Sequence, residues 1–180
     1  MKRLLRLSVL ALGLIAVVLL ATGPVAAKAT RIDFTGCEYD TNTFQEGDWT
    51  YPGHNMLLRG RIHPYYDVVP DEERVTGLVT VIASGNFKEE TFIGTAWGTF
   101  KTEPENEALG GYWEGIWVGP DNQPEIRLVG HGRGAFKGLE LRETLVWDED
   151  SLEKCQDQDP PDPEYTLFGY IEGYILDPGQ

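Results

Sequence analysis

Two glutamates that lie within runs of aromatic residues, Glu114 and Glu172, have the surroundings in this sequence that best suit acid–base chemistry. A carboxyl group enclosed by apolar walls has a raised pKa and can exchange a proton near neutral pH. Aromatic residues from the same half of the chain would form the wall of a pocket around a small apolar or amphiphilic molecule. The predicted wall residues are Trp97, Trp113, Trp117, Tyr170 and Tyr174.

The side-chain period of a β-strand leaves the environment of both glutamates open. In the segment 110–118, Glu114 falls on the face opposite Trp113 and Trp117, whereas Glu172 shares its face with the tyrosines two residues before and after it. Alternation alone does not say which face is inside. If both glutamates face water, they have no role in a pocket, and the sequence assigns no catalytic residue.

The three histidines do not predict a metal site. His54 and His63 are separated by an odd number of residues, so they point to opposite faces if they share a strand. His131 lies in a different segment. The acidic stretches 148–150 and 157–164 lack the ligand spacing of a calcium-binding loop, which favours a solvated acidic loop. We therefore expect neither a metal nor a cofactor.

Glycine alternates with aromatic and branched residues in four blocks, 94–100, 110–119, 130–147 and 167–175. Glycine weakens a strand unless the sheet must bend or a ring must lie across the backbone, so its repeated use predicts a curled, closed antiparallel sheet. The GHGRG run in the third block is followed by β-branched and aromatic residues rather than by a helix, which excludes a nucleotide-binding loop. Its glycines are expected to bend the sheet or to pack against Trp113 or Trp117.

Eight segments have the composition and length of strands, with turn-forming residues between them. They are 31–38, 55–66, 75–84, 91–102, 110–118, 125–136, 138–148 and 165–176. Pro64 indicates an edge position or a strand end. An even number of consecutive strands with short links predicts an all-β fold, an eight-stranded antiparallel up-and-down barrel. The interior of such a barrel is either filled by side chains or holds one small ligand.

Residues 1–29 have the layout of a secretory signal peptide, and residues 30–180 form the predicted barrel domain. A positively charged start precedes an apolar run, and small residues provide cleavage sites after Ala27 or Ala29. The apolar run is short for a membrane-spanning helix, which favours a cleaved leader over a retained anchor. We expect a secreted or cell-envelope protein without a stable membrane span.

The chain carries a net charge of −14, and removal of four positive side chains with the leader would leave −18. Such a surface repels nucleic acid and anionic lipid, so we expect no nucleic-acid partner.

The chain has two cysteines, Cys37 and Cys155, one near each end of the predicted domain. In an exported protein two cysteines are first interpreted as one disulfide. A closed barrel brings its first and last strands together, which fits a bond between these positions. Two unpaired thiols are the alternative.

The run 130–139, followed by Leu141 and Thr144, resembles a signature of the allene oxide cyclase-like barrel superfamily, which includes dirigent-type barrels. Other blocks resemble uncharacterised exported bacterial proteins assigned to this barrel type: 97–100, 110–117 and 169–178. The resemblance implies an eight-stranded barrel with a central cavity, often associating as dimers or trimers. It carries over no catalytic residue, because the polar pocket residues of the plant enzymes cannot be matched to positions here.

Three functions are compatible with these features. The first is a non-enzymatic binding protein that holds a small apolar or amphiphilic molecule in the barrel. The second is a structural or interaction domain with a filled barrel. The third is an enzyme of the cyclase or isomerase type, whose cavity folds a reactive substrate with little acid–base help.

Overall fold

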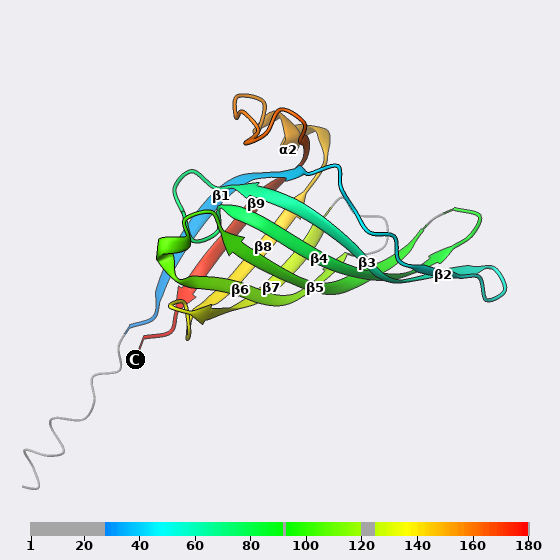
Figure 1. Ribbon diagram of the computed structural model, residues 1–180, viewed down its shortest axis with the longest axis horizontal. Coiled ribbons are helices and arrows are strands. Elements are labelled where there is room, and N and C mark those ends of the chain that lie inside the picture. The colour runs from blue at the N-terminus through cyan, green and yellow to red at the C-terminus, as the bar shows by residue number, and fades with distance from the viewer. Residues whose placement is uncertain (1–27, 92, 120–124, 180) are drawn as a thin grey trace, which may run out of the picture. The chain divides into compact units, whose positions relative to one another are not determined.

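Alternating apolar and small residues form nine antiparallel β-strands in the computed structural model, which describes residues 28–91, 93–119 and 125–179 (Figure 1). The strands are β1 (Thr30–Asp40), β2 (Asp48–Thr50), β3 (Asn55–Val68), β4 (Gly77–Lys88), β5 (Gly94–Pro104), β6 (Gly111–Gly119), β7 (Glu125–Gly134), β8 (Glu140–Val146) and β9 (Thr166–Asp177). Two short helices accompany them, η1 (Glu107–Leu109) and α2 (Glu149–Glu153). Most of the predicted leader, 1–27, and most of the turn predicted at 119–124 lie outside the described residues.

Eight of these strands close into a barrel. From β3 to β9 each strand pairs with its neighbour in the sequence, and β1 pairs with both β9 and β3. The β1–β9 ladder begins at Thr30 opposite Asp177, while the β1–β3 seam is only four residue pairs long, from Cys37–Val68 to Asp40–Tyr65. The predicted all-β, eight-stranded antiparallel barrel is confirmed.

Two elements were not predicted. Strand β2 pairs with the beginning of β3 outside the barrel, beside the ends of β3, β4 and β5 that extend beyond it (Figure 1). Helix α2 lies in the segment predicted as an acidic loop. Its N-cap residue Asp148 accepts a hydrogen bond from the Ser151 backbone N–H at 2.8 Å, which satisfies one of the free donors of the first turn. Across the described residues, we find no helix with the length and apolar character needed to span a membrane.

Pro64 lies inside β3, at a place where that strand is locally an edge. The N and O atoms of one strand residue point to the same side, and the Pro64 carbonyl accepts a hydrogen bond from Thr41 Oγ1 at 2.8 Å. The missing N–H therefore points to the same side as this carbonyl. On that side β3 has no paired strand at Pro64, because the β1–β3 seam ends at Tyr65 and the isolated bridge with Gln45 is at Ile62. No ladder hydrogen bond is lost there, which is why proline is tolerated.

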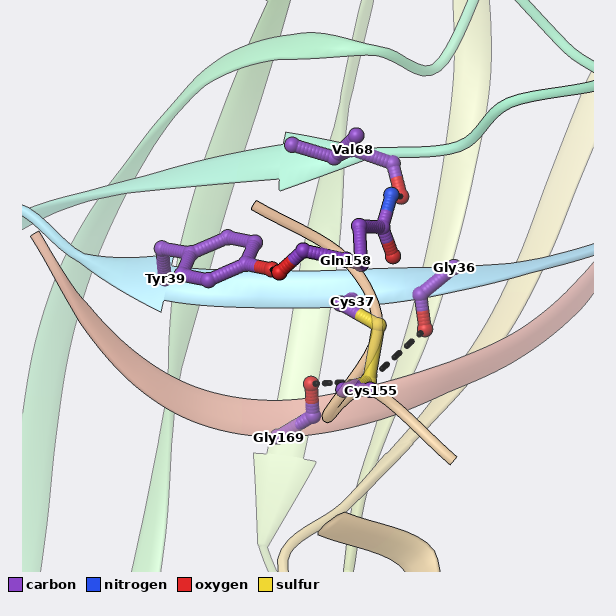
Figure 2. Close-up of a disulfide and its surroundings, with 7 residues drawn as sticks. All are labelled: Gly36, Cys37, Tyr39, Val68, Cys155, Gln158 and Gly169. Atoms are coloured by element: carbon purple, nitrogen blue, oxygen red, sulfur yellow. Dashed lines mark hydrogen bonds between the residues drawn. A yellow bond between two sulfur atoms is a disulfide. The ribbon is translucent and has the colours of Figure 1, made fainter. Parts of the chain in front are cut away.

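The disulfide predicted between Cys37 and Cys155 is present, with 6.0 Å between the two Cα atoms. Figure 2 shows Cys155 reaching β1 from the segment that follows α2. In the same segment, Gln158 accepts a hydrogen bond from Tyr39 Oη at 2.9 Å through its carbonyl, and its Nε2 donates to the Val68 carbonyl at 3.3 Å. The acidic segment is thus attached to the outside of the barrel, over the seam.

Of the glycines in the GHGRG run, Gly130 packs under a ring, but this ring is not one of the tryptophans we expected, and Gly132 and Gly134 lie against backbone atoms instead. A Cβ on Gly130 would lie 2.9 Å from the Phe100 ring. Trp117 lies instead over Gly98 of β5, where a Cβ would come within 2.7 Å of the indole Nε1. Glycine therefore makes room for aromatic side chains inside the barrel, as the alternation of these residue types predicted.

Two glycines of β6 allow a matched test of this packing. A Cβ on Gly115 would lie 2.0 Å from the Val129 carbonyl oxygen, whereas the nearest atom to a Cβ on Gly119 would be 3.5 Å away. We expect Gly115→Ala to lower the free energy of unfolding by about 1–3 kcal/mol, because the β6 and β7 backbones must separate, and Gly119→Ala to cost under about 1 kcal/mol. Urea unfolding measures both. Equal losses would contradict the packing.

Candidate functional site

The barrel interior is filled at one end and hollow at the other. The filled end lies where β1 begins and β9 ends, and Trp113 is its largest fully buried side chain. The indole of Trp113 donates a hydrogen bond to the Arg74 carbonyl at 2.7 Å and packs on Phe136, with 5.2 Å between ring centroids. This end is a conventional core without room for a ligand.

A partly open cavity of about 260 Å³ occupies the opposite end. Its apolar lining comes from six strands, so it belongs to the lumen and not to one loop. The apolar lining residues are Leu58, Val81, Ala83, Trp117, Ile126, Leu128, Leu145 and Phe168. Five polar residues from β1 and β3 complete it: Glu38, Asp40, Arg61, His63 and Tyr65. The cavity therefore has an apolar wall and one polar side.

Three of the polar residues form a chain. His63 Nε2 lies 2.9 Å from Asp40 Oδ1, and its Nδ1 lies 3.3 Å from the Tyr65 hydroxyl. The rings of His63 and Tyr65 are stacked, with 4.3 Å between their centroids. Burial raises the pKa of the Tyr65 phenol, and the nearby Glu38 carboxyl raises it further, so this hydroxyl stays protonated. Each of these three side chains thus has a hydrogen-bond partner within the group.

Two nitrogen donors at the cavity have no such partners. Arg61 Nε and Trp117 Nε1 are buried, and neither has a hydrogen-bond acceptor among the described residues. The Arg61 guanidinium lies 4.5 Å from the centroid of the Phe44 ring, which covers one of its faces. A buried donor without an acceptor costs about 1–3 kcal/mol, so two at one cavity require an explanation.

Three carboxyl groups lie buried inside the barrel next to the cavity. Glu38 and Asp67 are partners across the β1–β3 seam, and Glu143 comes from β8; their exposed fractions are 4%, 1% and 6%. Glu38 and Asp67 are hydrogen-bonded to each other through their side chains. Such a bond needs a proton, so at least one of the two is neutral. Glu38 is the member that lines the cavity.

Burial dominates the titration of all three groups. It raises the pKa values of Glu38 and Asp67 well above their usual range, and the nearby Glu143 raises both further. Burial alone raises the pKa of Glu143 to about 7. The cluster therefore holds protons at pH values where surface carboxylates have lost them.

The structure does not bring the seven predicted ligand-binding residues together. Trp117 lines the cavity, while Trp113 belongs to the filled end. Trp97 is on the outer face and 46% exposed. Tyr170 is also outside, where it packs beside the disulfide and under the Lys154 ammonium, 4.2 Å from its ring centroid. The predicted aromatic residues therefore do not enclose one cavity.

Both predicted glutamates point outward, which was the alternative left open by the sequence. Glu114 pairs with Arg133 at 2.7 Å, and Glu172 lies 3.6 Å from the Lys154 Nζ. Their side chains are 44% and 60% exposed, so neither is enclosed by apolar walls.

Glu172 and Tyr174 do line a second concavity, a groove of about 490 Å³ on the outer face of β1, β9, β8 and β7. Three arginines in this groove each pair with an acidic residue two positions away. The pairs are Arg31–Asp33 at 2.6 Å, Arg127–Glu125 at 2.6 Å and Arg142–Glu140 at 3.4 Å. Their charges are already compensated, and the groove lies on a solvated surface.

Sequence reasoning missed the polar side of the cavity. The residues missed are Glu38, Asp40, Arg61, Tyr65, Asp67 and Glu143, while His63 was considered only as a metal ligand. A signal exists: in 61–67 every second residue is polar or phenolic, and those between are apolar apart from Tyr66. The alternation in 61–67 separates a polar face of the strand from an apolar one, but it does not indicate that the polar face points into the barrel.

Within the described ranges, no group of three or more histidine, cysteine or acidic side chains could hold a metal ion. The arrangement offers instead an apolar cavity with two free donors and, at its wall, a carboxyl group whose pKa is raised by burial. No protein-family model, no curated protein and no solved structure matches this chain.

Proposed function

We propose that this protein is an exported binding protein that holds one small apolar or amphiphilic molecule in the hollow end of its barrel. The cavity is the observation that supports this proposal. Protein interiors are normally close-packed, so an open volume at one end of an otherwise filled barrel suggests that it holds a ligand. Its volume of about 260 Å³ is somewhat larger than the cavity of about 150 Å³ that accommodates benzene. A one- or two-ring molecule or a short chain fits this size.

Export is supported by two independent features. Residues 1–29 have the charge, apolar run and small residues of a secretory leader. The bond between Cys37 and Cys155 is of a kind that persists outside the reducing cytosol. The allene oxide cyclase-like relationship and association between copies of the chain stay predictions.

An enzyme of the cyclase or isomerase type is the second candidate, and the position of Glu38 favours it. A carboxyl group whose pKa is raised by burial, at the wall of an apolar cavity, can exchange a proton with a bound molecule. A barrel filled throughout is not supported, because the interior is open where β1 ends.

A substitution that fills the cavity tests the binding function. Ala83 lines the cavity, whereas the preceding residue in β4, Ile82, points outward and is 44% exposed. We expect the mature protein to bind 2-naphthol, a neutral two-ring probe, in a calorimetric titration. Ala83→Phe should weaken binding at least tenfold, because the new ring occupies the cavity, and Ile82→Phe should leave it within about twofold.

Unchanged affinity in the Ala83→Phe protein would place the probe elsewhere and overturn the proposal, as would the absence of binding to the unsubstituted protein. Circular dichroism of both variants establishes that each has kept the β-sheet spectrum.

A further inference from the structure

We propose that the cavity selects molecules that carry a carboxylate, which Arg61 and Trp117 bind through the two nitrogen donors left free inside the barrel. This inference rests on the proposed binding function and names the chemical class of the ligand. A bound carboxylate would give each of the two donors an acceptor that the described residues do not supply.

The two donors come from different strands but line the same cavity. Arg61 is on β3 and Trp117 is on β6, on the other side of the lumen. Arg61 Nε and Trp117 Nε1 each have an exposed atomic surface close to zero and no acceptor among the described residues. A ligand that offers acceptor atoms to both would satisfy them together, and a carboxylate has two oxygens for that purpose.

The charge of Arg61 is likewise uncompensated by an ion pair. The ion pairs found among the described residues are all formed by cations other than Arg61. Asp40 is held by His63 at 2.9 Å, and Glu38 is hydrogen-bonded to Asp67. The two carboxyl groups that share the cavity with Arg61 are thus already engaged, which leaves the guanidinium for an anion from outside.

The geometry favours a planar anion over a bulky one. The Phe44 ring covers one face of the guanidinium, so a ligand reaches it along its edge, where the N–H groups point. Carboxylates bind arginine edges in this way. The rest of the ligand would lie against the apolar wall, where Phe168 and Leu145 line the cavity.

The test compares 2-naphthoate with 2-naphthol in titrations of the mature protein at pH 7, with octanoate as a chain-like carboxylate. We expect naphthoate to bind at least tenfold more tightly than naphthol, since a hydrogen bond to a charged group is roughly twice as strong as one between neutral groups. Octanoate binding would show that a chain also fits, whereas binding of naphthoate alone would restrict the ligands to aromatic acids; either outcome supports carboxylate recognition.

Arg61→Gln should weaken naphthoate binding about 10- to 100-fold and change naphthol binding by less than about threefold. Trp117→Phe keeps the ring but removes the donor, and it should reduce naphthoate binding by about three- to tenfold. Arg59→Gln is the matched control, because Arg59 is exposed on the same strand and does not line the cavity.

The thermal unfolding midpoint provides a second readout. A donor that serves a ligand contributes little to folding without it, so Arg61→Gln should lower the unfolding midpoint by no more than about 4 °C, the loss of its contact with the Phe44 ring.

Equal affinity for naphthol and naphthoate, or an Arg61→Gln protein that keeps the preference, would overturn carboxylate recognition while leaving the binding function intact. Failure of every probe to bind would overturn the binding function itself. A large drop in the unfolding midpoint of Arg61→Gln would show that the arginine is structural and would also count against the inference.

Discussion

Replacement of Cys37 and Cys155 by serine is expected to lower the free energy of unfolding by about 5 kcal/mol. The disulfide joins residues 118 positions apart, and in the chain-entropy model a loop of this length restricts the unfolded chain by that amount. The bond also attaches the acidic segment over the β1–β3 seam, which has only four residue pairs. Urea unfolding of both proteins at one pH measures the difference.

Reduced, unsubstituted protein is the control for this experiment, because it lacks the bond but keeps both sulfur atoms. Its stability should agree with that of the double serine variant. A loss below about 1 kcal/mol in both would mean that the seam and the Tyr39–Gln158 contact hold the barrel closed without covalent help.

The second large effect is a loss of stability as the pH rises. The pKa of Glu143 is about 7 in the folded protein and about 4 in the unfolded chain, so the folded state holds its proton more tightly. The resulting stabilisation is fully present below about pH 4 and is lost as the pH rises through 7; for this residue alone the loss amounts to about 3 kcal/mol at pH 8. Glu38 and Asp67, whose pKa values are also raised by burial, act in the same direction.

Glu143→Gln separates this effect from the titration of the remaining acidic residues. The amide cannot ionise, so the variant should be about 2–3 kcal/mol more stable than the unsubstituted protein at pH 8 and within about 1 kcal/mol of it at pH 5. Glu114→Gln, on the exposed outer face of β6, should change stability by less than about 1 kcal/mol at both pH values.

Chemical denaturation from pH 5 to 8.5 gives the required curves. If the Glu143→Gln and unsubstituted curves stay parallel over this range, the buried carboxyl does not bind its proton in the way described.

The barrel could be predicted because its determinants are local. Strand-length runs of β-branched and aromatic residues lie between turns, and glycine lies where a ring crosses the backbone, as at Gly130 beneath Phe100. The predicted strands and the observed ones differ mainly at their ends. Strand β2 was missed because its three residues pair only with β3, a contact that no local pattern records.

The polar side of the cavity could not be predicted because its orientation depends on one irregularity in β3. Leu58 points into the barrel, and strict alternation from it would also turn Ile62 inward. The β3–β4 register shifts between Leu58 and Arg61, around Gly60 with a φ of 69°. This bulge reverses the alternation, so Arg61 and His63 face the lumen instead.

The same limit explains why the sequence left the environment of the glutamates open. Alternation correctly separated Glu114 from Trp113 and Trp117, but whether the tryptophan face is inside is decided by closure of the whole sheet. Once the barrel is closed, both tryptophans point inward and Glu114 meets Arg133 on the surface. The local sequence determines which residues of a strand share a face. Which of the two faces becomes the inner one is determined by contacts between distant strands.

The pairing of Thr30 with Asp177 means that the polypeptide enters and leaves the barrel at neighbouring positions of one rim. The cavity is at the other rim, where Asp40 and Phe168 lie. A fusion partner, an affinity tag or a solid support joined at Thr30 or at Asp177 would therefore leave the open end of the cavity unobstructed. New termini could also be introduced elsewhere by joining the existing ones with a short linker, without disturbing the strands that surround the lumen.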